Sequence, residues 1–156
     1  LQRADLNPIE EAEGYRRFVR VGRCQGHSSF IVHVDWSVDE QHMRSNSGDH
    51  ELLLWNAALC RQVTASRDLR DVQWATQTCP LTAETVGIWC AGKDGTDINS
   101  VARSHAATLL AVGDDFGKVN LYRYPALVSQ CAADVYSGHS SHVTQVAFLP
   151  DDIRLI

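Results

Sequence analysis

His27, Ser45, Ser47 and Asp49 are the residue types of a hydrolytic triad. In such an enzyme a histidine takes the proton from a serine nucleophile while a carboxylate orients the imidazole. The sequence has no Gly-x-Ser-x-Gly elbow, the strained turn that exposes such a serine. The same residue types also recur along the chain beside an aromatic residue that ends a strand. The pattern therefore predicts a structural hydrogen-bond network and no catalytic residue.

A second motif, Asp115-Phe116-Gly117, spells the metal-binding triplet of protein kinases. The sequence lacks the Gly-rich phosphate loop, the His-Arg-Asp catalytic loop and the strand lysine that kinases also need. We therefore interpret the triplet as a β-turn, in which the aspartate supplies local hydrogen bonds and Gly117 a permissive backbone.

The spacing of the histidines does not match that of a metal-binding site. None is spaced His-x-x-x-His on a helical face, and none pairs with cysteines at zinc spacing. Only His139 and His142 lie close in sequence. We expect structural or surface roles, with no metal and no cofactor, for all seven: His27, His33, His42, His50, His105, His139 and His142.

The composition and net charge limit the classes of partner that we expect for this protein. The 156 residues are 44% hydrophobic and 21% charged, which is typical of a globular domain. Apolar runs such as residues 106–112 fall far short of the roughly 20 residues that span a bilayer. The net charge of -5 argues against nucleic acid and anionic membranes as partners. A local basic cluster is interpreted as the exposed side of a strand, in preference to a polyanion site: Arg16, Arg17, Arg20 and Arg23.

Cysteine usage and the first residues indicate the compartment. Five scattered cysteines form no Cys-x-x-Cys pair and no even framework, which favours a reducing environment. Charged residues interrupt the N-terminal segment, where an export signal would need an apolar stretch. We expect a cytoplasmic location.

The elements that position these residues follow from an internal repeat. Residues Gly26–Trp36 recur as Gly138–Phe148, at an offset of 112. A degenerate copy, Asp97–Val101, aligns with the first copy at an offset of 67 and with the last at an offset of 45. A period of about 40 to 45 is typical of β-propeller blades. The first interval is longer by 22 and therefore contains an insertion.

The downstream halves of the copies also agree. Trp55 follows Phe30 by the same interval as Tyr122 follows Asp97. Each half has a polar turn and then an alternating strand that ends in an aromatic residue; Asp49 and Asp115 mark the turns, with one residue of slip left open. This patterning predicts antiparallel strands without a long helix. The predicted strands are 30–37, 41–46, 51–56, 98–104, 108–112, 118–124 and 143–148.

These residues resemble a WD-repeat blade, with Gly-His before the first strand and Ser, Asp and Trp further on. The resemblance implies a buried hydrogen-bond network of His27, Ser45 or Ser47, Asp49 and Trp55. The second copy lacks the histidine and ends in Tyr122, so its network around Asp115 must be incomplete, and the third contains only His139.

We therefore predict an all-β fold, a WD-repeat β-propeller segment of about two complete four-stranded antiparallel blades plus partial blades. Residues 1–25 end a preceding blade, 26–96 form a WD-type blade with an insertion at about 57–93, 97–137 form a degenerate blade, and 138–156 start a truncated one. Propellers close a ring that removes exposed sheet edges. We expect a longer polypeptide or partner subunits to complete the ring.

A closer resemblance is to the last propeller of the echinoderm microtubule-associated protein-like family, over about residues 15–156. The segments that carry it are 26–31, 34–37, 45–49, 74–76, 78–79, 87–89, 94–99 and 114–119, and those at 74–76 and 94–99 are not shared with generic WD repeats. The resemblance implies a non-catalytic cytoskeletal scaffold in the cytoplasm that binds tubulin or microtubules. The alternative is a WD-repeat adaptor in a non-cytoskeletal complex with other protein subunits.

No short motif specifies the contact residues of a propeller. The insertion at about 57–93 is the candidate binding region, because insertions within repeats map to loops on one face. The alternative, that it adds strands to an atypical blade, stays open. We interpret Trp36, Trp74 and Trp89 as core or blade-packing residues, although one of them could lie exposed at a propeller mouth.

Overall fold

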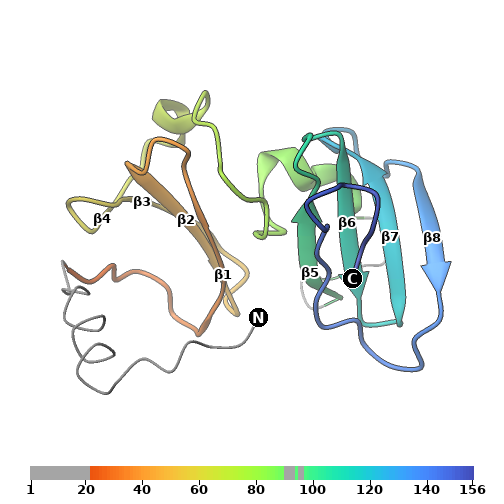
Figure 1. Ribbon diagram of the computed structural model, residues 1–156. Helices are drawn as coiled ribbons and strands as arrows, with labels where there is room; N and C mark the ends of the chain where they lie inside the picture. Colours follow the sequence, from red (N-terminus) through yellow and green to blue (C-terminus); the bar gives the residue numbers. More distant parts are fainter. Residues whose placement is uncertain (1–21, 90–93, 95–96) are drawn as a thin grey trace, which may run out of the picture.

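The computed structural model describes residues 22–89, 94 and 97–156. Its regular elements there are two four-stranded antiparallel sheets and two short 3-10 helices (Figure 1). The strand expected to carry the basic cluster from Arg16 to Arg23 lies outside the described residues apart from Gly22 and Arg23, which have no regular structure. No helix within the described ranges is long and apolar enough to cross a membrane. The all-β prediction is confirmed.

The first sheet has the order β1-β2-β3-β4. Its strands are β1 (Ile31–Trp36), β2 (His42–Ser47), β3 (Leu52–Asn56) and β4 (Arg61–Gln62). The sequence of β1, Ile-Val-His-Val-Asp-Trp, is rich in the β-branched and aromatic residues that favour strands. The register places Asp35 opposite Arg44 and Met43 opposite Trp55. Side chains of the three long strands therefore form two distinct faces.

The second sheet repeats this arrangement in the order β5-β6-β7-β8. Its strands are β5 (Ile98–Arg103), β6 (Leu109–Asp114), β7 (Lys118–Arg123) and β8 (Ala133–Ser137). The turn between β6 and β7 contains Gly117 at a φ of 71°, a conformation that favours glycine. A Cβ atom there would lie 2.5 Å from the carbonyl oxygen of His139. The Asp-Phe-Gly triplet is thus a tight turn, as its sequence predicts, but the local hydrogen bonds expected from Asp115 are accepted by Asp114, from the Phe116 and Lys118 backbone N–H groups.

The two sheets have the same strand pairing at equivalent positions. The starts of β1 and β5 are offset by 67 in residue number, as are the starts of β2 and β6. The ladder of each first hairpin is irregular at the same place, between Ile31 and His33 and between Ile98 and Ser100. The repeat offset inferred from the sequence is therefore the offset of the structure.

The strand predicted at 143–148 is wrong. Its one ladder contact is an isolated bridge between Phe148 and Leu155, which matches the Trp36–Met43 pair at an offset of 112. Two of its backbone N–H groups point elsewhere, from Val143 to the Asp114 carbonyl and from Val146 to the Ser100 hydroxyl. These two bonds hold the segment against the second sheet, while the Ala147 N–H bonds the Ile156 carbonyl.

The insertion forms two 3-10 helices, η1 (Ser66–Leu69) and η2 (Ala83–Ile88), and its only strand among the described residues is the two-residue β4. It runs between the two sheets, with η2 beside the second (Figure 1). The Gly87 N–H donates to the Ala126 carbonyl at 2.7 Å, and the Ala126 N–H donates to the Glu84 carbonyl at 2.8 Å. The described part of the insertion is a packed connector between the sheets.

The core lies around β6. Ile88 of η2 packs with one face of the second sheet, and Val143 and Val146 pack with Ala111 on the other. The first sheet differs, because many of its apolar side chains are exposed. Of the three tryptophans, Trp36 is 47% exposed and takes the exposed alternative left open for one of them. Trp74 is 8% exposed, and Trp89 packs partly buried against the core of the second sheet. The other exposed apolar residues on and around β1 are Phe30, Ile31, Val32, Val34 and Val38.

Candidate functional site

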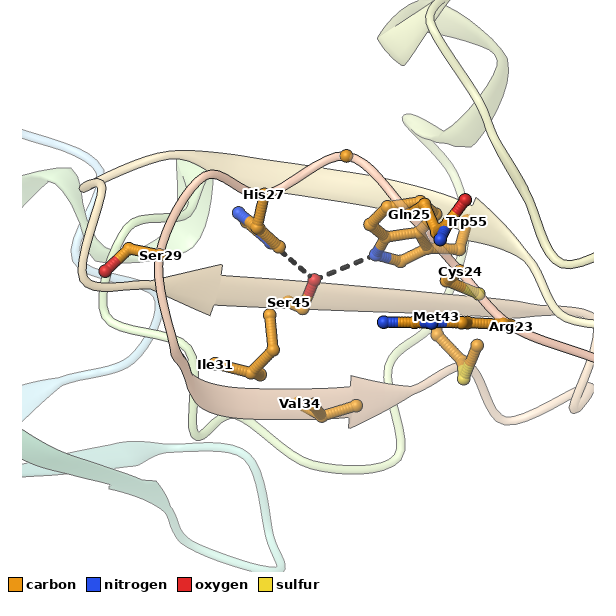
Figure 2. A pocket seen from close by; sticks show the side chains of 11 residues that line it. Arg23, Cys24, Gln25, His27, Ser29, Ile31, Val34, Met43, Ser45 and Trp55 are labelled. Atoms are coloured by element: carbon orange, nitrogen blue, oxygen red, sulfur yellow. Dashed lines mark hydrogen bonds between the residues drawn. The ribbon is translucent and has the colours of Figure 1, made fainter.

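The predicted network forms around the hydroxyl of Ser45, a buried residue of β2. The indole N–H of Trp55 donates to this oxygen at 2.8 Å, and Nε2 of His27 lies 2.8 Å from it (Figure 2). Because an indole can only donate, the serine proton is free to bond the imidazole. The other ring nitrogen, Nδ1, then carries the proton that faces Asp49 at 3.1 Å.

Asp49 lies in the turn that follows β2 and is partly buried. Its carboxylate accepts the backbone N–H groups of Ser28 at 2.9 Å and Glu51 at 3.0 Å. Hydrogen bonds from Ser47, from these backbone groups and from His27 outweigh partial desolvation and lower the pKa of Asp49. The carboxylate therefore holds the Gly-His segment before β1 against the turn.

The structure distinguishes the two candidate serines. Ser45 contacts His27, whereas the Ser47 hydroxyl accepts the backbone N–H of Asp49 at 3.3 Å and acts within the turn. The chain of contacts is thus Asp49, His27, Ser45 and Trp55. It joins the segment before β1 to β2, β3 and the turn between them.

This arrangement has the connectivity of a Ser-His-Asp triad, the constellation that hydrolytic enzymes use. A cavity of about 370 Å³ borders it, and His27, Ser45 and Trp55 are among the lining residues (Figure 2). A nucleophilic serine needs a lone pair that can approach the substrate. In Ser45 the indole of Trp55 occupies one lone pair, and the residue is paired on both sides within the sheet.

The second copy has a different set of contacts. When the two sheets are aligned by their strand registers, Asp115 is equivalent to Gly48 of the first copy. The predicted alignment of Asp115 with Asp49 is therefore off by one residue. Asp115 accepts from Asn99 at 2.6 Å and lies 2.8 Å from Nδ1 of His142. These two contacts, Asn99 first, lower the pKa of Asp115.

The buried carboxylate of the second copy is Asp114. It accepts from the backbone N–H groups of Phe116 and Lys118 and from the Asn120 amide at 2.9 Å. Tyr122 is buried at the position of Trp55. His139 is exposed on the connection after β8, and the structure does not bring it to the network of the first copy.

A second buried polar cluster was missed by the sequence reasoning. Asp35 of β1 and Arg44 of β2 form an ion pair with Nε and Oδ2 2.9 Å apart, and their side chains are 0% and 2% exposed. The guanidinium also donates to Gln77 at 2.7 Å and lies 4.4 Å from the ring centroid of Trp74. Asp35 accepts from the Thr76 hydroxyl at 2.6 Å.

We call Asp35, Arg44 and insertion residues 74–79 the insertion clasp. The backbone N–H groups of Thr78 and Cys79 also donate to Asp35, at 2.8 and 3.1 Å. Burial acts to raise the pKa of Asp35, but the Arg44 charge and the hydrogen bonds outweigh it and lower the pKa. The clasp fixes the insertion to the first sheet through charge-assisted hydrogen bonds.

One trio has donor atoms close enough for a metal ion. A ring nitrogen of His27 and carboxylate oxygens of Asp49 and Glu51 lie within 4.8 Å of one another. His27 and Asp49 already bond each other, and Glu51 is exposed. The trio therefore supports no metal assignment, and the absence of a metal stays a prediction.

Comparison with known proteins decides the family. Residues 9–156 match the family model described as the echinoderm microtubule-associated protein second beta-propeller. The chain belongs to the echinoderm microtubule-associated protein family. This match confirms both the family and the propeller fold that the repeat predicted.

Several echinoderm microtubule-associated proteins are similar to the chain over most of its length. Echinoderm microtubule-associated protein-like 1 of Rattus norvegicus is 53% identical over 90% of the chain, which covers 17% of that protein. The 77 kDa echinoderm microtubule-associated protein of Strongylocentrotus purpuratus is 53% identical, with 90% and 21% covered. Rat echinoderm microtubule-associated protein-like 2 is 54% identical, with 92% and 22% covered. The chain spans about a fifth of the length of these relatives.

Proposed function

We propose that this chain is a propeller segment of a longer microtubule-associated protein, a scaffold of the cytoplasmic cytoskeleton whose partner is tubulin or the microtubule. The observation that carries the proposal is the identity of 53% over 90% of the chain with proteins named for microtubule association. We call the longer protein the parent polypeptide.

The two sheets are, on this proposal, neighbouring blades of one ring. Residues 26–96 and 97–137 form the blades, 1–25 end a preceding blade, and 138–156 start the next. The shared register supports this division. So does the hydrogen bond between Nε2 of His33 on β1 and the carbonyl of Asn99 on β5, at 3.1 Å. A preceding blade would cover exposed apolar residues on β1, such as Ile31 and Val34.

The scaffold is non-catalytic on this proposal. The one Ser-His-Asp chain among the described residues is also bonded to Trp55, and a structural role accounts for every contact it makes. A satisfied buried network makes the packing of its strands specific. The insertion at about 57–93 is the proposed binding region, and the clasp supplies the rigidity that a binding surface needs.

A pull-down with soluble tubulin tests this function. The parent polypeptide should retain tubulin, and the same polypeptide without residues 22–156 should retain much less. Equal retention of tubulin by the two proteins would favour an adaptor in a non-cytoskeletal complex.

A further inference from the structure

A groove lies between the first sheet and the insertion, with a volume of about 440 Å³. Leu52 and Leu54 of β3 line it from the sheet, and Leu69 and Trp74 line it from the insertion. Arg67 and Arg70, both exposed, are among the other lining residues. We call this the insertion groove.

The insertion groove lies on the side of the first sheet that faces the rest of this chain. Leu54 pairs with Arg44, so both lie on the face that carries the insertion clasp. The cavity beside Ser45 is on the opposite face, where Ile31 and Val34 would meet a preceding blade (Figure 2). Ring closure by a preceding blade would fill that cavity and leave the insertion groove open.

The charges of the groove are unbalanced. Its lining contains Arg44, Arg67, Arg70 and one carboxylate, Glu84. Glu84 is engaged by Arg44 at 3.3 Å, and Arg44 is matched again by Asp35 in the clasp.

The two remaining guanidiniums are weakly held. Arg67 lies 3.7 Å from Asp68, but these side chains are 90% and 64% exposed, and solvent screens such a pair. Asp68 does not line the groove. Arg67 and Arg70 therefore present two positive groups beside an apolar floor.

We propose that the insertion groove binds an acidic peptide segment of a partner protein. An apolar side chain of the peptide packs on Leu52 and Leu54, and its carboxylates pair with Arg67 and Arg70. Guanidinium and carboxylate match as bidentate partners, and the apolar floor lowers the local dielectric around them. The inference goes beyond the proposed function, since it fixes the chemistry of a ligand without requiring that the ligand be tubulin.

Fluorescence anisotropy with a labelled peptide, Glu-Glu-Glu-Leu-Glu-Glu-Glu, tests the proposal on the parent polypeptide. We expect saturable binding that weakens with added salt, and no binding of the matched peptide with glutamine in place of glutamate. The double variant Arg67→Glu/Arg70→Glu should weaken binding by about tenfold or more, because both charge-assisted pairs become repulsive. The matched control is Lys118→Glu/Arg123→Glu, which makes the same charge change at exposed positions of β7, outside both the groove and the insertion. It should stay within about twofold of the native affinity, since those sites lack the apolar floor.

Failure of the native protein to bind the glutamate peptide would overturn the proposal, as would equal weakening in the two double variants. Near-ultraviolet circular dichroism checks that each variant is folded. If the charge reversal unfolds the protein, Arg67→Gln/Arg70→Gln takes its place with the same expected direction. The tubulin pull-down uses a different ligand, so either result can fail alone.

Discussion

The indole N–H of Trp55 donates to the hydroxyl oxygen of Ser45 at 2.8 Å. One residue comes from β3 and the other from β2, and both are buried. The same hydroxyl contacts His27, so a single oxygen joins two strands to the segment that precedes β1. Loss of any member leaves a buried polar group without its partner, which is costly.

Trp55→Ala should destabilise the propeller strongly. The change removes a large side chain that is 4% exposed and leaves the Ser45 hydroxyl without its donor. We expect a loss on the order of 3–5 kcal/mol, measured by denaturant unfolding of the parent polypeptide. Cys24→Ser, at a half-buried thiol, should cost much less. Comparable losses in the two variants would contradict the network.

Asp35→Ala should destabilise because it leaves the Arg44 guanidinium buried without its main counter-charge. Breaking a buried pair from one side costs about 3–5 kcal/mol. The double variant Asp35→Ala/Arg44→Met should recover part of this loss, since it removes the stranded charge. Arg154→Met breaks an exposed pair with Asp151 and should cost far less, because solvent screens that pair. A double variant less stable than Asp35→Ala would show that the guanidinium does not need its partner.

The stability of the propeller should fall in acid through carboxylates whose pKa is lowered by folding, Asp49 among them. Such a group stabilises the fold above its unfolded pKa of about 3.9, and this contribution is lost as the pH falls towards the folded pKa. Asp49→Asn should therefore reduce the slope of the unfolding free energy between about pH 5 and 3. Chemical denaturation at several pH values measures that slope. An unchanged slope would mean that Asp49 is not held by these hydrogen bonds.

Residues 1–156 alone should lack a cooperative unfolding transition. Phe30, just before β1, is 74% exposed and Trp36 of β1 is 47% exposed, and an uncovered apolar sheet face of this kind is unstable in water. Calorimetry and binding of a hydrophobic dye to the isolated segment check this expectation. A soluble monomer with one sharp transition would show that the segment is a domain in its own right.

Most of the two sheets could be predicted from the sequence, because period-2 alternation and the repeat offset constrain the first three strands of each. The fourth strands escaped detection. β4 is only two residues long, and β8 is mostly exposed and lacks a buried face. The predicted strand at 143–148 is reduced to a single bridge: the Ala147 N–H bonds the Ile156 carbonyl, whereas the Val143 and Val146 N–H groups bond Asp114 and Ser100 of the second sheet.

Some residues of the candidate site could be predicted from the sequence and others could not. His27, Asp49 and Trp55 could be predicted because the repeat aligns them with the pattern of a WD-repeat blade. Ser45 and Ser47 both lie on the same strand, and only the fold distinguishes which of them contacts His27. The contacts of the insertion clasp could be predicted from the sequence only in part. Asp35 and Arg44 are charged residues inside two predicted strands, and their hairpin pairing could have been inferred from the short turn between them. Their contacts with residues 74–79 bridge a long stretch of irregular chain, which no periodicity describes.

Microtubule co-sedimentation of the parent polypeptide, with and without residues 22–156, tests the central claim most directly. Taxane-stabilised microtubules at increasing concentration would be pelleted with each protein, and circular dichroism would check that the shortened protein is folded. The proposal predicts saturable pelleting of the parent polypeptide and an affinity for microtubules at least about tenfold weaker after the deletion, a difference of roughly 1.4 kcal/mol or more. Pelleting curves that coincide would contradict the assignment of this propeller segment to microtubule association.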